Sequence, residues 1–262
     1  MAATTLISTE QLSYEDWLEY RRTGIGGSDA SVVCGISRYK SPVELWMEKT
    51  GQMPPQETGE AAYWGNQLEA LVRDEFTRRT GISVRKPTVI LQSEEHPFML
   101  ANLDGICEDP THGTCIFEAK TASAYKAGEW EDRIPDEYMI QIQHYMAVTG
   151  YAGAYIAVLI GGNTFRWKFA ERDEELIAML ISLESDFWAH VQSETPPALD
   201  GSDASARFLS ERFPTSVPKS QIALPDEAGE LLLQYDEACE QLKTLTEQKQ
   251  RAENLLKQMM GD

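Results

Sequence analysis

Two carboxylates and a lysine, Asp104, Glu118 and Lys120, lie near the middle of the chain. Side chains alternate along a strand, so Glu118 and Lys120 should share one face of a strand predicted over 115–121. Asp104 belongs to the neighbouring strand of a predicted hairpin, which would bring the three side chains to one end of a sheet. Two carboxylates with carbonyl and water oxygens suit Mg²⁺ or Mn²⁺. A lysine beside them could position or deprotonate water, or stabilise charge at a phosphorus centre. A surface ion pair between Glu118 and Lys120 is the alternative interpretation.

Polar residues on two predicted helices could extend this group. Glu69 falls on or near the apolar face of a helix over 60–80, with Leu68 and Val72, where an unpaired carboxylate would be costly. Gln141 lies on a helix that follows the strands. Both residues therefore become candidates for the same site.

A glycine-rich turn near the start of the chain has the chemistry of an anion site. Gly26, Gly27 and Ser28 follow Arg21 and Arg22 and precede a short helix. Backbone N–H groups, a hydroxyl and a guanidinium all favour a phosphate. An ordinary turn beside solvated arginines is the alternative.

The elements that would position these residues alternate between helices and strands. Capping residues, Gly and Pro punctuation and apolar periodicity predict helices, at 9–22 with Ser8 or Thr9 as the cap, from about 30, at 41–51, 60–80, 136–149, 171–192 and from 225 to the end. Strand-like segments occur at 83–91, 98–107, 115–121, 152–160 and 164–170. Loops are expected at 53–59 and 196–218. We expect an α/β (mixed α+β) fold with a central mixed sheet flanked by helices, in a domain over 1–205, followed by a linker and C-terminal helix over 206–262.

The C-terminal segment has apolar residues at two positions of a seven-residue repeat, as in a coiled coil or a long packed helix. The residues at one position are Ala228, Tyr235, Leu242, the charged Lys249 and Leu256, and those at the other are Leu231, Ala238, Leu245, Ala252 and Met259. The helix could pack on its own domain or dock on another chain, and the alanines and Lys249 weaken the case for a strong zipper.

Composition sets the outer limits. The 262 residues carry a net charge of −19 and are 42% hydrophobic, which is typical of globular protein and excludes wholesale disorder. No apolar run approaches the roughly 20 residues that span a bilayer, and the first residues do not resemble a secretory signal. The four cysteines form no disulfide framework, which favours a cytoplasmic protein. The acidity argues against coating nucleic acid through bulk charge, but allows an acidic site for divalent cations.

Taken together and in this order, the motifs resemble the PD-(D/E)XK nuclease superfamily. Within it they are similar to the YqaJ-type viral recombinase family, which includes lambda exonuclease and the alkaline exonucleases. The motifs are Trp17-Leu-Glu-Tyr-Arg21, Arg22-Thr-Gly-Ile-Gly-Gly-Ser28-Asp29, Ser41-Pro42-Val-Glu-Leu45-Trp46, Gly65-Asn-Gln-Leu-Glu69, Leu103-Asp104-Gly105, Glu118-Ala-Lys120 and Tyr138-Met-Ile-Gln141-Ile-Gln-His-Tyr145. The resemblance covers residues 9–192. The leading proline-aspartate of the superfamily is Leu103-Asp104 here, which leaves the carboxylate in place.

The resemblance implies a restriction-endonuclease-like core and a role for each matched residue. Asp104, Glu118 and the carbonyl of Ala119 would ligate one or two Mg²⁺ ions, for which Mn²⁺ could substitute. Glu69 would complete the metal site directly or through water. Lys120 would orient the attacking water, and Gln141 would hold that water or Lys120.

The resemblance also implies a substrate and an assembly. Arg21 and Ser28, with Gly27 and the neighbouring Arg22, would bind the 5′-phosphate at the end of double-stranded DNA. The activity would be 5′-to-3′ exonuclease digestion that releases 5′-mononucleotides and leaves a 3′ single strand for an annealing protein. A homotrimeric ring in the cytoplasm of a bacterial or phage-infected cell is expected.

Two other functions remain open. One is a structure-specific or restriction-type endonuclease of the same fold, and the other is a non-catalytic DNA-binding scaffold. If DNA is bound despite the net charge, basic residues such as Arg21, Arg22, Lys120 and Lys126 should form a local path to Asp104.

For several other residues a structural role is expected rather than a part in the site. Cys107, His112 and Cys115 offer only three ligands, whereas a structural zinc site has four. His144 is expected to be packed or hydrogen-bonded. Trp130 is expected to pack, with base stacking beside Lys126 as the alternative.

Overall fold

A five-stranded mixed sheet lies at the centre of the N-terminal part of the computed structural model, which describes residues 3–53, 59–215 and 221–261. The strand order is β2-β5-β6-β7-β8, with bounds β2 (Val84–Arg85), β5 (Gly105–Asp109), β6 (Gly113–Ala122), β7 (Gly153–Ile160) and β8 (Thr164–Glu171). β6 and β7 run parallel, whereas the other neighbouring pairs are antiparallel. The predicted central mixed sheet is confirmed.

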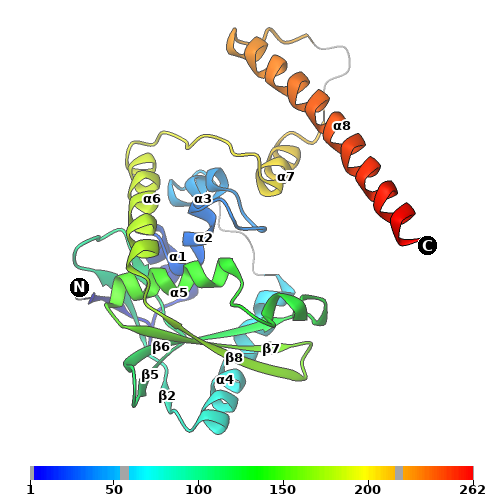
Figure 1. The fold of residues 1–262 in the computed structure, drawn as a ribbon. Coiled ribbons are helices and arrows are strands. Elements are labelled where there is room, and N and C mark those ends of the chain that lie inside the picture. Colours follow the sequence, from blue (N-terminus) through cyan, green and yellow to red (C-terminus); the bar gives the residue numbers. More distant parts are fainter. Residues whose placement is uncertain (1–2, 54–58, 216–220, 262) are drawn as a thin grey trace. The chain divides into compact units, whose positions relative to one another are not determined.

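Helices cover the two faces of this sheet (Figure 1). On one face, Val72 and Phe76 of α4 (Glu60–Thr80) pack against Phe117 of β6. On the other face, Ile142 and Met146 of α5 (Asp136–Thr149) join the main core. Both helices end at glycines with positive φ, Gly81 and Gly150, as the punctuation in the sequence indicates.

A second sheet corrects the prediction for the first residues. Its three strands have the order β1-β3-β4, with bounds β1 (Ala3–Ser8), β3 (Val89–Ser93) and β4 (Leu100–Ala101). The helix predicted over 9–22 is also too long at its start, because α1 spans only Tyr14–Arg22. The Ser13 hydroxyl accepts the Asp16 N–H and caps that helix, so Ser8 and Thr9 are not the caps.

Two other strand predictions are wrong in extent. The segment 83–91 contributes β2 to one sheet and β3 to the other. The segment 98–107 divides into β4 and β5, because residues 102–104 leave the strand before the hairpin begins.

The remaining helices pack on one another, on α5 and on β7. Their bounds are α2 (Gly27–Val33), α3 (Pro42–Lys49), the 3₁₀ helix η1 (Ala124–Trp130), α6 (Glu174–Gln192) and α7 (Asp203–Arg212). The predicted loop over 196–218 is wrong where α7 forms. Ser202 caps α7, and Phe208 packs into a core with Trp46 and Phe187. Residues 54–58 of the predicted loop at 53–59 lie outside the described residues.

The chain divides into two units, Met1–Pro214 and Thr215–Asp262. The boundary predicted after residue 205 falls inside α7. The second unit contains α8 (Glu227–Met260), which confirms the predicted C-terminal helix, and none of its residues is buried. Among the described residues, no helix has an apolar stretch long enough to cross a membrane.

Candidate active site

The hairpin of β5 and β6 brings the two predicted carboxylates together. Gly105 pairs with Phe117 across the hairpin, which places Asp104 beside Glu118. The Asp104 carboxylate accepts a hydrogen bond from the Ala119 N–H at 3.0 Å. This bond fixes Asp104 immediately before β5, at the edge of the strand that carries Glu118 and Lys120.

Lys120 and Gln141 hold the Glu118 carboxylate from two sides. The Lys120 Nζ donates to Glu118 Oε1 at 2.7 Å and to Gln141 Oε1 at 2.9 Å. Gln141 Nε2 donates to the same Glu118 oxygen at 2.7 Å, so the three side chains close a ring. The Glu118 side chain is only 3% exposed, which excludes a surface ion pair as the explanation of this pattern. We call Asp104, Glu118, Lys120 and Gln141 the carboxylate cluster.

The electrostatics of the carboxylate cluster favour a bound cation. Glu118 Oε2 is buried and has no hydrogen-bond partner among the described residues. Burial raises the pKa of Glu118 despite the neighbouring Lys120. Burial and the Glu118 carboxylate raise the pKa of Asp104 to about 8. Lys120 therefore does not fully compensate the negative charge, and a cation that prefers oxygen ligands fits the unpaired Glu118 oxygen and the Asp104 carboxylate.

The Glu69 carboxylate, which was predicted to complete the metal site, is hydrogen-bonded to basic residues in the structure. It accepts hydrogen bonds from Lys86 Nζ at 2.7 and 2.9 Å and from Arg73 at 3.3 Å. It is near enough to Asp104 and Glu118 to raise both of their pKa values. Within the described part of the chain, however, no group of three or more His, Cys, Asp or Glu residues is arranged to hold a metal ion.

The glycine turn forms a second polar group around a buried aspartate. Asp29 is 4% exposed. Its carboxylate accepts hydrogen bonds from Arg21 at 3.0 Å, Lys49 at 2.7 Å and the Gly26 N–H at 3.1 Å. Arg21 also donates to the exposed Ser28 hydroxyl at 3.2 Å and lies over the Trp17 ring. We call Arg21, Gly27, Ser28, Asp29 and Lys49 the arginine pocket.

Arg22 is not part of the arginine pocket. It pairs with Glu19 of its own helix at 2.9 Å. The structure therefore brings Arg21, Gly27 and Ser28 together and leaves Arg22 to one side.

Tyr145 connects the two groups. Its hydroxyl accepts a hydrogen bond from Gln141 of the carboxylate cluster at 3.2 Å. Its ring lies so close to Gly27 that a Cβ on Gly27 would be 2.5 Å from Tyr145 Cε1. Only glycine fits at this position, so the start of α2 can approach the side of α5 that carries Gln141.

The buried Asp29 and Lys49 are not among the site residues predicted from the sequence. A signal for Asp29 existed, because an acidic residue three positions after Gly26 is typical of the first turn of a capped helix. Lys49 had no such signal. Its burial depends on the packing of α3 beside α2, and it also donates to the Arg21 carbonyl oxygen at 2.7 Å.

The other candidate residues have structural contacts. His144 is buried and lies 2.8 Å from Glu184 of α6 and 2.9 Å from the Leu100 carbonyl oxygen, as a packed, hydrogen-bonded residue should. Trp130 is 2% exposed and stacks on Tyr138, which confirms the packing interpretation.

Lys126 lies at the surface, where it donates to the Tyr39 hydroxyl at 3.0 Å. Cys107 and Cys115 are buried, and the His112 ring packs on Phe169 with ring centroids 4.2 Å apart.

Comparisons with known proteins identify the family. The model of the YqaJ-like viral recombinase domain matches residues 16–152. The protein YqaJ of Bacillus subtilis is 44% identical over 265 residues, which cover 99% of this chain and 82% of the relative. The chain belongs to the YqaJ-like viral recombinase family. A mimivirus protein, R354 of Acanthamoeba polyphaga mimivirus, is 28% identical over 53% of this chain and 27% of its own length.

Solved structures of exonucleases share the fold of this family member. The alkaline exonuclease LHK-Exo of Laribacter hongkongensis, in a complex with dAMP, superposes with a TM-score of 0.55 at 20% identity, over 76% of this chain and 97% of that one. A phage-related exonuclease of Haemophilus somnus has a TM-score of 0.51 at 15% identity, over 68% and 99% of the two chains. The fold is therefore of the restriction-endonuclease-like type, with its mixed sheet between helices.

Proposed function

We propose that this family member is a Mg²⁺-dependent exonuclease that digests double-stranded DNA from 5′ to 3′, releases 5′-mononucleotides and leaves a 3′ single strand. The observation that carries the proposal is the state of Glu118. One of its oxygens is held by Lys120 and Gln141, while the other is buried and has no partner in the described ranges of the chain. A buried carboxylate in this state is suited to a cation and is costly without one.

Each member of the carboxylate cluster has a defined part in this reaction. Asp104, Glu118 and the Ala119 carbonyl would hold Mg²⁺, with Mn²⁺ as a substitute, and we propose two ions. Bound Mg²⁺ would stabilise negative charge on the attacking and leaving oxygens of an in-line displacement. Lys120 stays protonated, because Glu118 and Asp104 raise its pKa against the effect of burial. It would therefore orient the attacking water by donating to it, while Gln141 fixes the direction of the ammonium group.

The arginine pocket would set the polarity of digestion. Arg21 and Ser28 present a guanidinium and an exposed hydroxyl to a terminal 5′-phosphate, and Gly27 lets α2 lie close to Tyr145. A phosphate held there would fix where the first phosphodiester lies relative to the carboxylate cluster. The dAMP in the LHK-Exo complex supports a deoxynucleoside monophosphate as the type of product for this fold.

The partners follow from the same family resemblance. We propose DNA ends with a 5′-phosphate as the substrate, a homotrimer as the assembly, a single-strand annealing protein as the next participant and the cytoplasm as the compartment. A local basic path to Asp104 remains a prediction.

A digestion assay on linear duplex DNA with Mg²⁺ tests the proposal. One duplex is labelled at its 5′ ends and a second at its 3′ ends. We expect early release of the 5′ label as a mononucleotide. Early release of the 3′ label would contradict the polarity. A covalently closed circle should stay intact, because cleavage of the circle would indicate an endonuclease. Absence of divalent-cation binding by calorimetry would indicate a non-catalytic scaffold.

A further inference from the structure

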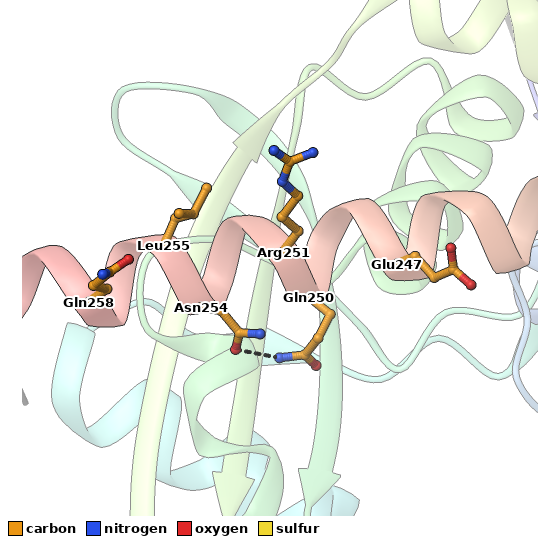
Figure 2. Close-up of a pocket in the computed structure, with 6 residues that line it drawn as sticks. All are labelled: Glu247, Gln250, Arg251, Asn254, Leu255 and Gln258. Atoms are coloured by element: carbon orange, nitrogen blue, oxygen red, sulfur yellow. Dashed lines mark hydrogen bonds between the residues drawn. The ribbon is translucent and has the colours of Figure 1, made fainter.

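The C-terminal helix α8 has an apolar face with no partner among the described residues of its own unit. It spans 34 residues, and none is buried. Leu231, Leu242, Leu245 and Leu256 are each between 59% and 67% exposed. A hollow of about 400 Å³ on α8 is lined by polar side chains and meets the edge of this apolar face at Leu255 (Figure 2). The helix is therefore amphipathic along its whole length, and its apolar face is available to a partner.

We infer that this face binds α8 of a second copy of the chain in an antiparallel coiled coil. The argument is the order of large and small residues along the seven-residue repeat. The first repeat position holds Ala228, Tyr235, Leu242, Lys249 and Leu256. The second holds Leu231, Ala238, Leu245, Ala252 and Met259. In an antiparallel pair, each residue of the first set faces one of the second set on the other helix.

An antiparallel alignment about the midpoint of α8 matches side-chain volumes in every layer. It places the two-fold axis between Lys243 and Thr244, so that the whole of Glu227–Met260 overlaps. The layers, with the residue of one copy named first and that of the other second, are Ala228 with Met259, Leu231 with Leu256, Tyr235 with Ala252, Ala238 with Lys249, and Leu242 with Leu245. The three small residues thus face the two largest side chains or Met259, and leucine faces leucine elsewhere.

A parallel pair of the same helices would be poorly matched. Like residues would meet, so that alanine faces alanine in three layers and Tyr235 faces Tyr235. Lys249 would face Lys249 inside the seam, where two ammonium groups repel each other. In the antiparallel pair Lys249 lies over Ala238, which leaves it free to reach Glu253 of its own helix, at 3.7 Å.

The area that can be buried is sufficient for a stable pair. Six large side chains occupy the seam of each helix: Leu231, Tyr235, Leu242, Leu245, Leu256 and Met259. Each removes on the order of 100 Å² from water, which gives about 600 Å² per copy. Leu232 and Leu255, at flanking positions and 58% and 45% exposed, bring the total near the roughly 800 Å² per partner of a standard interface.

Light scattering on the full chain tests the pairing. We expect an assembly with an even number of chains, whether one pair or, with the proposed trimer, two rings. Leu242→Glu combined with Leu245→Glu should halve its mass, because both residues lie in the central layers. Leu233→Glu is the matched control, since Leu233 is 65% exposed on the opposite face of α8. An odd number of chains, an unchanged mass of the double variant, or equal dissociation by Leu233→Glu would overturn the inference.

Disulfide trapping tests the orientation without disturbing the central layers. The background carries Cys239→Ser, because Cys239 is exposed whereas the other three cysteines are at least partly buried. A tagged chain with Tyr235→Cys is mixed with an untagged chain with Ala252→Cys. We expect a disulfide between the two different chains, which share a layer only in the antiparallel pair. Cross-linking of the Ala252→Cys chain to itself, or no cross-link at all, would overturn the arrangement.

Discussion

The carboxylate cluster and the arginine pocket treat a buried carboxylate in opposite ways. Burial alone would raise the pKa of Asp29, but Lys49 and Arg21 hold it well below its usual range. Glu118 also has a lysine partner, yet its pKa is raised, and its Oε2 atom has no hydrogen-bond partner among the described residues. Both oxygens of Asp29 are therefore hydrogen-bonded within the protein, whereas one Glu118 oxygen is left for the cation that we propose.

This difference matches the two roles that we propose, which are phosphate binding for the arginine pocket and metal binding for the carboxylate cluster. The Asp29 carboxylate holds Arg21 in a fixed direction, while two cations against one carboxylate leave a net positive charge for an anion. In the carboxylate cluster two carboxylates face one ammonium group, and a bound metal ion would compensate this excess of negative charge. The predictions below separate these two properties, beginning with the largest expected effect.

Removal of Lys120 should have the largest effect on activity. Lys120→Ala takes away the donor that we propose for the attacking water, so we expect the rate of Mg²⁺-dependent digestion to fall about 10³-fold, within the usual range for such a group. Single-turnover digestion of linear duplex measures the effect. Lys168→Ala is the control, because Lys168 donates to the Glu131 carbonyl oxygen at the surface and should change the rate only slightly. Near-normal turnover by Lys120→Ala would remove Lys120 from catalysis.

Removal of Arg21 should affect recognition of the DNA end more than the reaction itself. The wild-type protein should digest a 5′-phosphorylated duplex about 10-fold to 100-fold faster than a 5′-hydroxyl duplex, the range for one or two charged hydrogen bonds. Arg21→Ala should abolish most of this preference. Arg22→Ala should keep it, because Arg22 pairs with Glu19. Equal wild-type rates on the two substrates would show that the arginine pocket does not bind the 5′-phosphate.

Removal of metal should lower stability in a pH-dependent way through Asp104. Its pKa is raised to about 8, whereas that of an unfolded aspartate is about 3.9. The folded state therefore holds more protons than the unfolded state between these values, and Asp104 makes the metal-free protein less stable as pH rises from about 4 to about 8. Thermal unfolding with a chelator should show this decline in the wild-type protein and a weaker one in Asp104→Asn.

Saturating Mg²⁺ should offset the same loss. We expect it to raise the unfolding temperature of the wild-type protein at pH 8 by about 5 to 10 °C, from ligand linkage at roughly 100-fold excess over the dissociation constant. Asp104→Asn should show little increase. An equal increase in both proteins would place the bound ion elsewhere.

Sequence reasoning succeeded where the signal is local. Helix α4 ends at Gly81 because glycine adopts the left-handed conformation there, and the sequence alone indicates this. The hairpin of β5 and β6 and the alternation of Glu118 and Lys120 are equally local. The shared face of these residues with Gln141 could be predicted once the order of strands and helix was set.

The features that the sequence did not predict depend on contacts between residues far apart in the chain. β1 forms because Ala3–Ser8 pairs with Val89–Ser93, a contact that no short pattern in either segment specifies. Asp29 forms an ion pair with Lys49 because α2 packs on α3, and the orientation of Glu69 depends on its ion pair with Lys86. Long-range ion pairs of this kind decide which charges a site has available, and they come only from the assembled fold.

The smallest effect is expected for Glu69, which lies beside the carboxylate cluster. In the structure its carboxylate is held by Lys86, which is 51% exposed and free to move away when a cation is bound. If Glu69 then joins Asp104 and Glu118, Lys86→Ala should lower the Mg²⁺ concentration for half-maximal digestion a few-fold, because Glu69 loses a competing cation. Glu69→Gln should raise that concentration. Arg78→Ala is the matched control, since it removes an exposed charge of α4 that pairs with Glu75. A higher Mg²⁺ requirement in Lys86→Ala would instead mean that the Lys86 ion pair holds Glu69 in its working position. Glu69 would then act on the carboxylate cluster through its charge alone.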